Sequence, residues 1–536
     1  MGTPSQDKAA SLIAKESELC NDRKPHEPDW NDIVNLVRPV SGGYDAAAGR
    51  FVTQRTVMMY DGTAPDALED LAGGLHSYLT NPTERWFTLE VENNADLNRD
   101  PEVLEWLDIV SDIIYQAYSD EDANFNPSLH EGYLDIGSFG TCVVFQEAAT
   151  RGVRFFTFPI RDCTIAENSK GRVDTLYRKF YWSIRQCKQE FGDVLPGEMA
   201  GKRDDEIMEM MHCVFPRKDR NAKMLNKTNK AFASYWVCIT CKEVCEESGF
   251  DSFPYAVARW TKLAGEKYGR SPAKKCLADI KMLNAMEKTV LKAANKLVDP
   301  PLVVDNEGVM TPLETHAGAL IYKDPEANAP EPLVMGGNGL PFTEEKSAQK
   351  REYIRKSFYS DWLKMEKQNV EMTAYEVADR RDEKLRMIAP MLGRLVCELH
   401  GPLIQRTYSI LNEQRMFPPA PVQMRGSLLK IGYQSPAARA QTGSKAVTMG
   451  RYLQQIIPLA QAHPEILDVI DWDGFAQETA IALGVPRKML NTIHKIEEIR
   501  NQRAQQQQLS ALAGMAEPVS KAMKNVADAN QAGGLM

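Results

Sequence analysis

The spacing of apolar residues predicts a mainly helical chain with one β-rich region. Up to about residue 40, and again in "DGTAPDALEDLAGGLHSYLTNP" and "EVLEWLDIVSDIIYQAY", apolar positions recur at three and four residues, as on one face of a helix. "SLHEGYLDIGSFGTCVVFQE" predicts a short helix, a turn at Gly137 and Gly140, and a buried strand. Short strand-like runs fill residues 150 to 260. We therefore expect an α+β fold in which helix predominates.

The segment from Pro272 to Val298 predicts one long helix with a continuous apolar face. A helix of this length spans about 40 Å, and Pro300 and Pro301 must end it because proline cannot continue the hydrogen-bond ladder. A second long helix is expected from about Thr343 through "EEKSAQKREYIRKSFYSDWLKMEK". The Pro- and Gly-rich stretch between them predicts short strands and turns. The pattern is that of a stalk with a small β-rich tip.

Further helices are expected after "QNVEMT". One begins at "TAYEVADRRDEKLRM", where Thr373 and Glu376 have the spacing of a capping box. Others fall within residues 446 to 500. The Gln-, Ala- and Gly-biased end of the chain is expected to be frayed or disordered.

Composition is that of a folded globular chain. The 536 residues are 43% hydrophobic, which allows two to four domains with their own cores. No apolar run approaches the ~20 residues that cross a bilayer, and the first residues lack a secretory pattern. We expect a soluble protein of intracellular origin that binds no membrane.

Charge is strongly segregated along the chain. Residues 61–135 contain eighteen Asp and Glu against Arg85 and Arg99, a net of −16 within an overall charge of −9. A second acidic stretch, residues 299–345, has nine acids and only Lys323. Segregated charge is often only solvated surface. The alternative interpretation is that the charged surfaces make oriented contact with a polyanion or with further copies of the chain.

Motifs for catalysis are absent from the sequence. Gly443-Ser444-Lys445 lacks the first glycine of a phosphate-binding loop, and Leu134 stands where a second zinc-binding histidine would follow His130-Glu131. No nucleophile elbow occurs, and the eight histidines are widely spread. We expect no enzyme activity, no catalytic residue and no cofactor.

One cysteine cluster, "CITCKEVC", is a weak candidate for metal binding. Cys238, Cys241 and Cys245 supply three thiols, and His212 with Cys213 is a doubtful second pair. The alternative is that these cysteines are small apolar fillers of a strand, with Val237, Ile239 and Cys241 on one face. The second interpretation is favoured, so no metal is expected.

Lysines form a stripe on the long helix. Lys281, Lys288 and Lys292 follow at spacings of seven and four residues. They either keep an exposed helix soluble, or face a phosphate backbone, or face acids of a neighbouring copy.

Three stretches together resemble a known family: "GEKYGRSP" before the long helix, "SLHEGYLDIGSFGTCVVF", and "MTAYEVADRRDEKLRMIAPMLGRLVCELHGPLIQRTYSIL". They resemble the portal proteins, or head-to-tail connectors, of short-tailed podovirus-type bacteriophages, in order and length over nearly the whole chain. The "CITCKEVC" cluster departs from the family pattern.

The resemblance implies the portal fold, with its parts in chain order. They are a wing (1–270), a first stem helix (271–298), a clip (299–342), a second stem helix (343–366), a tunnel loop (367–372), a long wing helix and its return (373–440), a crown (441–500) and a flexible or barrel-forming extension (501–536).

The resemblance also implies function. Family members form dodecameric rings at one capsid vertex of the virion, through which double-stranded DNA is packaged and ejected. Implied partners are the terminase large subunit, the major capsid and scaffolding proteins, and the tail adaptor, with synthesis in the host bacterial cytoplasm. Candidates for contact with DNA in the channel are Lys281, Lys288, Lys292, Lys364 and Lys367. A metal-dependent enzyme and a non-portal virion assembly scaffold are the alternatives.

Overall fold

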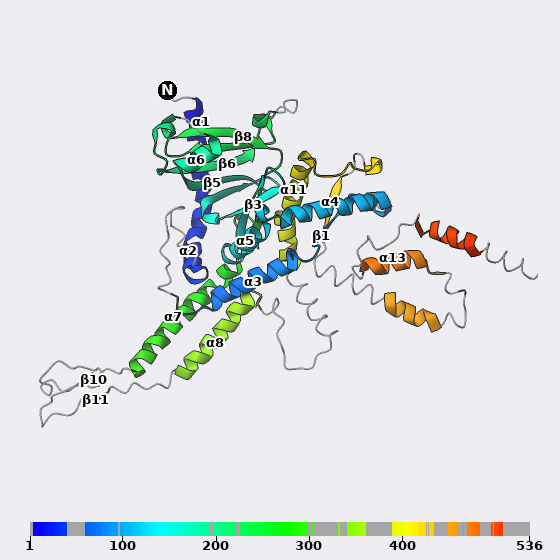
Figure 1. Cartoon of the computed structure of the whole chain (residues 1–536). Coiled ribbons are helices and arrows are strands. Elements are labelled where there is room, and N and C mark those ends of the chain that lie inside the picture. Colours follow the sequence, from blue (N-terminus) through cyan, green and yellow to red (C-terminus); the bar gives the residue numbers. More distant parts are fainter. Residues whose placement is uncertain are drawn as a thin grey trace, which may run out of the picture. The chain divides into compact units, whose positions relative to one another are not determined.

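A computed structural model describes most of the chain (Figure 1). The described residues are 4–39, 59–94, 97–192, 195, 197–220, 226–298, 302–303, 331–332, 340–360, 389–424, 426, 428–433, 449–458, 465, 469–482, 495–496 and 498–507. The chain divides into two compact units. Residues 1–92 and 106–435 form the first, and residues 93–105 and 436–536 form the second.

A five-stranded antiparallel sheet forms one layer of the first unit, with strand order β4-β5-β6-β7-β8. Its strands are β4 (Cys163–Glu167), β5 (Val173–Ser183), β6 (Ile207–Pro216), β7 (Phe232–Cys238) and β8 (Glu243–Phe250). Side chains alternate between the two faces, as the pleat requires. Met211 and Cys213 pack on one face with α1 (Pro4–Arg23), while Met208 and Met210 pack on the other with α6 (Ile184–Phe191).

A second, three-stranded sheet has the order β3-β2-β9. Its strands are β2 (Thr141–Ala148), β3 (Val153–Phe158) and β9 (Tyr255–Arg259). Helix α5 (Phe125–Phe139) packs on β2 and β3, and α11 (Gly401–Glu413) also contacts these strands. Because helices cover β2, its first six residues are all buried. That burial explains why the run Cys142–Phe145 is apolar on both faces instead of alternating.

Aromatic side chains fill the space between α5 and the helix before it, α4 (Pro101–Ser119). The rings of Tyr118 and Phe125 stack with centroids 4.1 Å apart, and Trp86 stacks on both at 6.2 Å. Trp86 directly precedes β1 (Phe87–Val91), which pairs antiparallel with β12 (Leu429–Tyr433). In this pair Thr88 lies opposite Gly432, which is 344 residues later in the chain. This strand pair therefore joins the last residues of the first unit to a strand from its N-terminal part.

Two long helices, α7 (Pro272–Val298) and α8 (Leu340–Ser357), lie side by side (Figure 1). They pack against α2 (Glu27–Leu36) and α3 (Thr63–Leu79). Beyond their ends, β10 (Leu302–Val303) and β11 (Glu331–Pro332) form a short antiparallel pair. The predicted bounds of α7 are confirmed.

Helix α8 begins three residues before the predicted start near Thr343, and the predicted end at residue 366 lies outside the described residues. α8 begins at Leu340, and its regular turns end at Ser357, where Tyr359 adopts the left-handed conformation with φ of 61°. Phe358, which is fully buried, and Tyr359 form a turn, after which Ser360 is again helical. Residues 361–388, including the predicted tunnel loop, lie outside the described residues.

Two other local predictions were also wrong. Gly137 lies inside α5, where Leu68 comes so close that a Cβ would be 2.4 Å from its Cδ1, and only Gly140 forms the turn. Cys241 lies in the turn after β7, because the chain reverses there with Lys242 at φ of 55°. Cys241 therefore packs on the opposite side of the sheet from Val237.

Helices make up most of the described residues of the second unit. Its helix α13 (Trp472–Ala482) is joined to residues 498–507 by a bidentate ion pair, in which Arg500 donates to both carboxylate oxygens of Asp473 at 2.6 and 2.7 Å. Residues 449–458 form a further helix. Taken over both units, the mainly helical α+β class predicted from the sequence is confirmed.

Candidate functional site: the root of the long helices

The first turn of α7 is capped by its own sequence. The hydroxyl of Ser271 accepts a hydrogen bond from the backbone N–H of Lys274 at 2.9 Å, and Pro272 occupies the first helical position. Both are preferred there, because the hydroxyl satisfies a free N–H and proline has none to satisfy. Just before the cap, Tyr268 is fully buried with its ring edge-on to Trp30 of α2. The start of α7 is therefore anchored in the core.

Two glycines bring the turn before α7 against the turn after α5. Gly140 ends α5 with φ of 81°, a conformation that disfavours every other residue. A Cβ on Gly269 would lie 2.0 Å from the carbonyl oxygen of Gly140. The N–H of Gly269 donates to the Thr141 hydroxyl at 2.8 Å. The two backbones can pass this closely only because neither residue has a side chain.

A buried arginine connects this junction to the C-terminal part of the first unit. Arg259, with only 1% of its surface exposed, donates to both carboxylate oxygens of Glu398, from Nε at 3.0 Å and from Nη2 at 2.7 Å. Its Nη1 also pairs with Glu167, whose carboxylate is shared with Lys262. Burial by itself would lower the pKa of Arg259, but the bonds and charges of Glu398 and Glu167 outweigh it and raise that pKa. The guanidinium is thus held charged in the interior.

Glu398 owes its position to a local irregularity. Residues Val396–His400 form a single π-helical turn directly before α11. The wider turn contains an extra residue relative to α-helix and changes the direction in which its side chains point. His400, at the end of this turn, is 3.0 Å from the hydroxyl of Tyr133, which in turn is 3.1 Å from the hydroxyl of Thr80. Burial lowers the pKa of His400 to about 3, so its imidazole is neutral.

The three stretches that carry the family resemblance therefore meet in space. Gly269 comes from "GEKYGRSP", Gly140 and Tyr133 come from the helix–turn–strand stretch, and Glu398 comes from the third. Arg259, Glu398 and His400 were not singled out from the sequence. The sequence signal for Arg259 is its place as a charged residue at the end of an apolar strand. That signal does not identify the acidic residues with which it pairs.

The structure places the predicted lysines in different surroundings. Lys281 pairs with Asp32 of α2, and the ammonium of Lys288 lies 5.6 Å from the ring centre of Tyr60. Lys292 is exposed and forms no ion pair with a described residue. Lys364 and Lys367 lie outside the described residues. The three described lysines therefore differ in their contacts: Lys281 has an acidic partner, Lys288 lies near an aromatic ring, and Lys292 is exposed.

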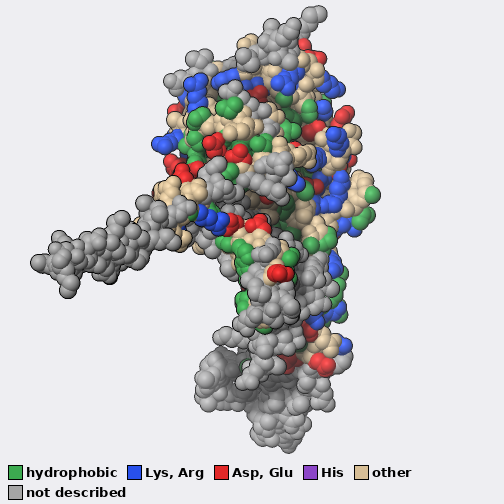
Figure 2. Space-filling model, turned by 90° about the vertical axis from the view of Figure 1, so that its right-hand side faces the viewer, with side chains coloured by type: hydrophobic (Ala, Val, Ile, Leu, Met, Phe, Trp, Pro, Cys, Tyr) green, Lys and Arg blue, Asp and Glu red, His purple; other side chains and the backbone are tan. Residues whose placement is uncertain are grey.

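Figure 2 shows that basic and acidic side chains are interspersed on the described surface of one face of the molecule. Many of these charges are matched within the chain. Lys350 and Arg351 of α8, for example, pair with Asp279 and Glu287 of α7 at 2.6 and 2.8 Å. These two pairs join the long helices to each other.

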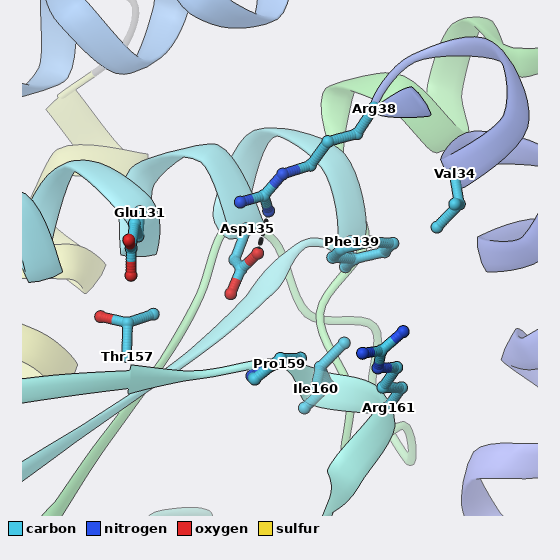
Figure 3. Close-up of a pocket in the computed structure, with 9 residues that line it drawn as sticks. All are labelled: Val34, Arg38, Glu131, Asp135, Phe139, Thr157, Pro159, Ile160 and Arg161. Atoms are coloured by element: carbon cyan, nitrogen blue, oxygen red, sulfur yellow. Dashed lines mark hydrogen bonds and ion pairs between the residues drawn. The ribbon is translucent and has the colours of Figure 1, made fainter. Parts of the chain in front are cut away.

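A small cavity is lined by residues of α2, α5 and β3 and of the segments that follow α2 and β3 (Figure 3). It encloses about 100 Å³, and Figure 3 shows Arg38 reaching over it to pair with Asp135. Burial raises the pKa of Asp135, and the charge of Arg38 opposes that effect. Since Arg38 and Asp135 pair with each other and the space would hold only a few waters, we assign no reaction to it.

The candidate cysteines sit in an apolar cluster. Cys238 is buried, and Cys241 and Cys245 are partly buried beside Cys187 and Met199. Burial raises the pKa of Cys245 to about 12, so its thiol stays protonated. Across the described residues, no group of three or more His, Cys, Asp or Glu side chains is arranged to hold a metal ion.

Comparison with known proteins identifies the family. The sequence model of the family described as "Bacteriophage head to tail connecting protein" matches residues 9–490. The chain belongs to this family. The resemblance drawn from the three stretches is thereby confirmed, as is its implied function as a portal, or head-to-tail connector.

Individual relatives agree with the family assignment. The "Probable portal protein" of Bordetella phage BPP-1 is 29% identical over 94% of this chain and 92% of its own length. The "Portal protein" of Salmonella phage epsilon15 is 27% identical over 96% and 95%. A solved structure, "Neck of empty GTA particle computed with C6 symmetry", covers 78% of this chain and 94% of its own at 12% identity and a TM-score of 0.38. Structural similarity at that level does not establish a shared fold, so the assignment rests on the sequence.

Family membership also indicates where in the virion the chain is located. Connecting proteins are structural components of the virion, located at the capsid vertex, and the family implies a ring of identical subunits. In the portion of the chain that the structure describes, no helix has the length and apolar character to span a bilayer.

Proposed function

We propose that this connector forms a dodecameric ring through which double-stranded DNA is packaged and later ejected. The observation that carries the proposal is the family match over residues 9–490. The junction at the root of α7 supports it, because a conduit that bears pressure requires its long helices to be fixed to the body of each subunit. Arg259, Gly269 and Ser271 provide that attachment.

The parts of the chain are proposed to have the roles of their portal counterparts. Residues 1–270 would form the wing, 271–298 and 343–366 the stem helices, 299–342 the clip, 367–372 the tunnel loop, 373–440 the wing helix and its return, 441–500 the crown, and 501–536 its extension. Two observations support this division: α7 has the predicted bounds, and β10 pairs with β11 between the two long helices.

The proposed partners follow from these parts. The clip would bind the terminase large subunit during packaging and the tail adaptor afterwards. The body would contact the major capsid protein and scaffolding proteins during assembly in the host bacterial cytoplasm. The metal-dependent enzyme and the non-portal scaffold considered from the sequence gain no support from any described feature.

Assembly is tested by native mass spectrometry and averaged electron micrographs of the purified protein. We expect a particle of about twelve times the 60.2 kDa chain mass with a central hole. A chain that stays monomeric or dimeric at high concentration and moderate salt would refute the ring.

Contact with DNA is proposed chiefly for Lys364 and Lys367, beside the tunnel loop. The change Lys367→Glu should reduce the length of DNA packaged and retained, because it replaces an attraction to phosphate with repulsion. Lys170→Glu, at an exposed turn between β4 and β5, is the matched control. Packaging and retention that match the control would exclude the channel role of Lys367.

A further inference from the structure

Two cysteines lie at the tip of the hairpin that joins β7 to β8. Cys238 is the last residue of β7, and Cys241 follows it in the turn, so the two form a Cys-x-x-Cys sequence. The backbone N–H of Cys241 donates a hydrogen bond to Sγ of Cys238 at 3.3 Å. Because Sγ of Cys241 is joined to that nitrogen through Cα and Cβ alone, rotation of its side chain can bring the two sulfurs together.

Hydrogen bonds fix the shape of the turn that carries these cysteines. The N–H of Ile239 donates to the carbonyl oxygen of Glu209 in β6 at 2.9 Å, and the N–H of Lys242 donates to the carbonyl oxygen of Ile239 at 3.3 Å. Lys242 has the left-handed conformation, with φ of 55°. Both cysteines consequently lie in the cluster on the α6 side of the sheet. A disulfide between them would therefore involve mainly rotation of side chains.

The two thiols differ in exposure. Cys238 is fully buried, whereas Cys241 is partly exposed at the end of the hairpin. Burial raises the pKa of the Cys238 thiol, and hydrogen bonds from Cys241 and from the N–H of Thr240 oppose that effect. The pair thus consists of one sulfur that a dissolved reagent can reach and one that is shielded behind it.

A cation lies beside the pair. The ammonium of Lys202 is 3.4 Å from Sδ of Met208, which belongs to the same buried cluster as Cys238. The pKa of Lys202 is raised, first by its hydrogen bond to Glu206 at 2.8 Å and further by the negative charge that the sulfurs of Cys241 and Cys238 carry when ionised. A nearby positive charge favours the thiolate, which is the reactive form of cysteine.

We propose that Cys238 and Cys241 are a site of oxidative modification, at which a small-molecule disulfide converts the two thiols into an intrachain disulfide. The thiolate of Cys241 attacks one sulfur of the small molecule, which gives a mixed disulfide on Cys241 and releases one thiol. Sγ of Cys238 then attacks Sγ of Cys241, and the proton of Cys238 passes to the second departing sulfur. The two cysteines lose two electrons and two protons in all, and the small-molecule disulfide becomes two thiols.

The location of the chain in the virion makes this modification relevant. A virion component is exposed to the extracellular medium, which is oxidising and in which disulfides persist. The disulfide would constrain the hairpin that ends in β8, an edge strand of the five-stranded sheet, which is paired on one side only. The inference does not depend on the proposed ring or on the passage of DNA.

Peptide mapping of the full chain tests the pair directly. The protein is incubated with excess oxidised or excess reduced glutathione, its remaining thiols are alkylated after denaturation, and it is digested with trypsin. Cleavage after Lys230 and Lys242 places both cysteines in residues 231–242 and leaves Cys245 in the next peptide. Relative to reduced glutathione, oxidised glutathione should lower the amount of the doubly alkylated peptide at least about ten-fold. The same peptide should appear without alkylation and lighter by two hydrogens.

Three results would overturn the proposal. A species in which the two tryptic peptides are cross-linked would show that Cys245 takes the place of one member of the pair. A peptide that keeps both thiols in excess oxidised glutathione would show that these cysteines are only apolar fillers. Oxidation that begins only after a chelator is added would show that the thiols are ligands of a metal ion.

Variants test the roles of the two sulfurs. Cys238→Ser should stop at the mixed disulfide, so residues 231–242 should retain one glutathione on Cys241. Cys241→Ser should take up at least about ten-fold less glutathione, because the remaining thiol is buried. Cys245→Ser is the matched control, since it removes a thiol from the same cluster and leaves the pair intact. It should form the disulfide as the unmodified protein does, and circular dichroism verifies that each variant folds. Glutathione on Cys238 in place of Cys241 would overturn the assigned order of attack.

Discussion

Individual residues at the root of α7 act through close approach and buried charge. Gly269 and Gly140 let two turns touch, and Arg259 holds three segments of the chain together through Glu167 and Glu398. Removing one partner from such a buried pair leaves an uncompensated charge, so these residues constrain one another.

The close approach of the glycines predicts a steric effect. Gly269→Ala should lower the free energy of unfolding by about 2 kcal/mol, because its Cβ would overlap the Gly140 carbonyl oxygen, and overpacking costs about that much. Gly73→Ala is the control, since a Cβ at this position in α3 has nothing within 4 Å. It should be neutral or slightly stabilising. Urea denaturation at a fixed subunit concentration measures both, and equal effects would contradict the prediction.

The buried histidines predict a loss of stability in mild acid. Burial, and then the charge of Arg178, lower the pKa of His212 to about 3. The unfolded chain, with a histidine pKa of about 6.5, therefore binds more protons between pH 6.5 and 3. Stability contributed by the neutral imidazole is complete above pH 6.5 and falls as pH decreases. At pH 5 the loss from His212 should be about 2 kcal/mol.

His212→Gln tests this effect through the difference between the free energies of unfolding at pH 7 and pH 5. The variant should lose less stability across this interval than the unmodified protein, even if it is less stable at both pH values. Ser234→Ala removes the hydroxyl 2.9 Å from Nε2 but keeps the imidazole, so it should retain the full pH dependence. An unchanged difference for His212→Gln would show that other groups dominate.

Elements depend on how they begin and on what they pack against. α7 begins at a cap and a proline, and α8 ends where Phe358 enters the core. The first signal is local and can be read from a few residues. The second depends on distant packing partners, so the spacing of apolar residues did not predict the turn at Phe358 and Tyr359.

The cap of α7 predicts the effect of one hydroxyl. Ser271→Ala should lower the free energy of unfolding by about 1 kcal/mol, because the N–H of Lys274 loses its acceptor. Ser271→Thr keeps the hydroxyl and should lose less. Thermal denaturation of the three proteins compares them. If the alanine variant were as stable as the unmodified protein, water or another group would have to replace the cap.

The whole molecule divides into two compact units, and the contacts described at the root of α7 all belong to the first. A chain ending at Ser435 should therefore keep the melting transition of the sheets and long helices, with a midpoint within about 4 °C of the full chain. Circular dichroism during heating measures the midpoint. Loss of the cooperative transition would show that residues 436–536 stabilise the first unit.

Sequence alone determined what depends on neighbours along the chain. The apolar spacing and flanking prolines of α7 predicted its bounds, and the order of three stretches indicated the family. Local spacing determines these features because helix geometry and capping involve residues only a few positions apart. Tertiary structure alone decided which side chains meet. Arg259 and Glu398 are 139 residues apart, and Lys281 pairs with Asp32 across 249. No local pattern specifies such partners, since they depend on how separate elements pack.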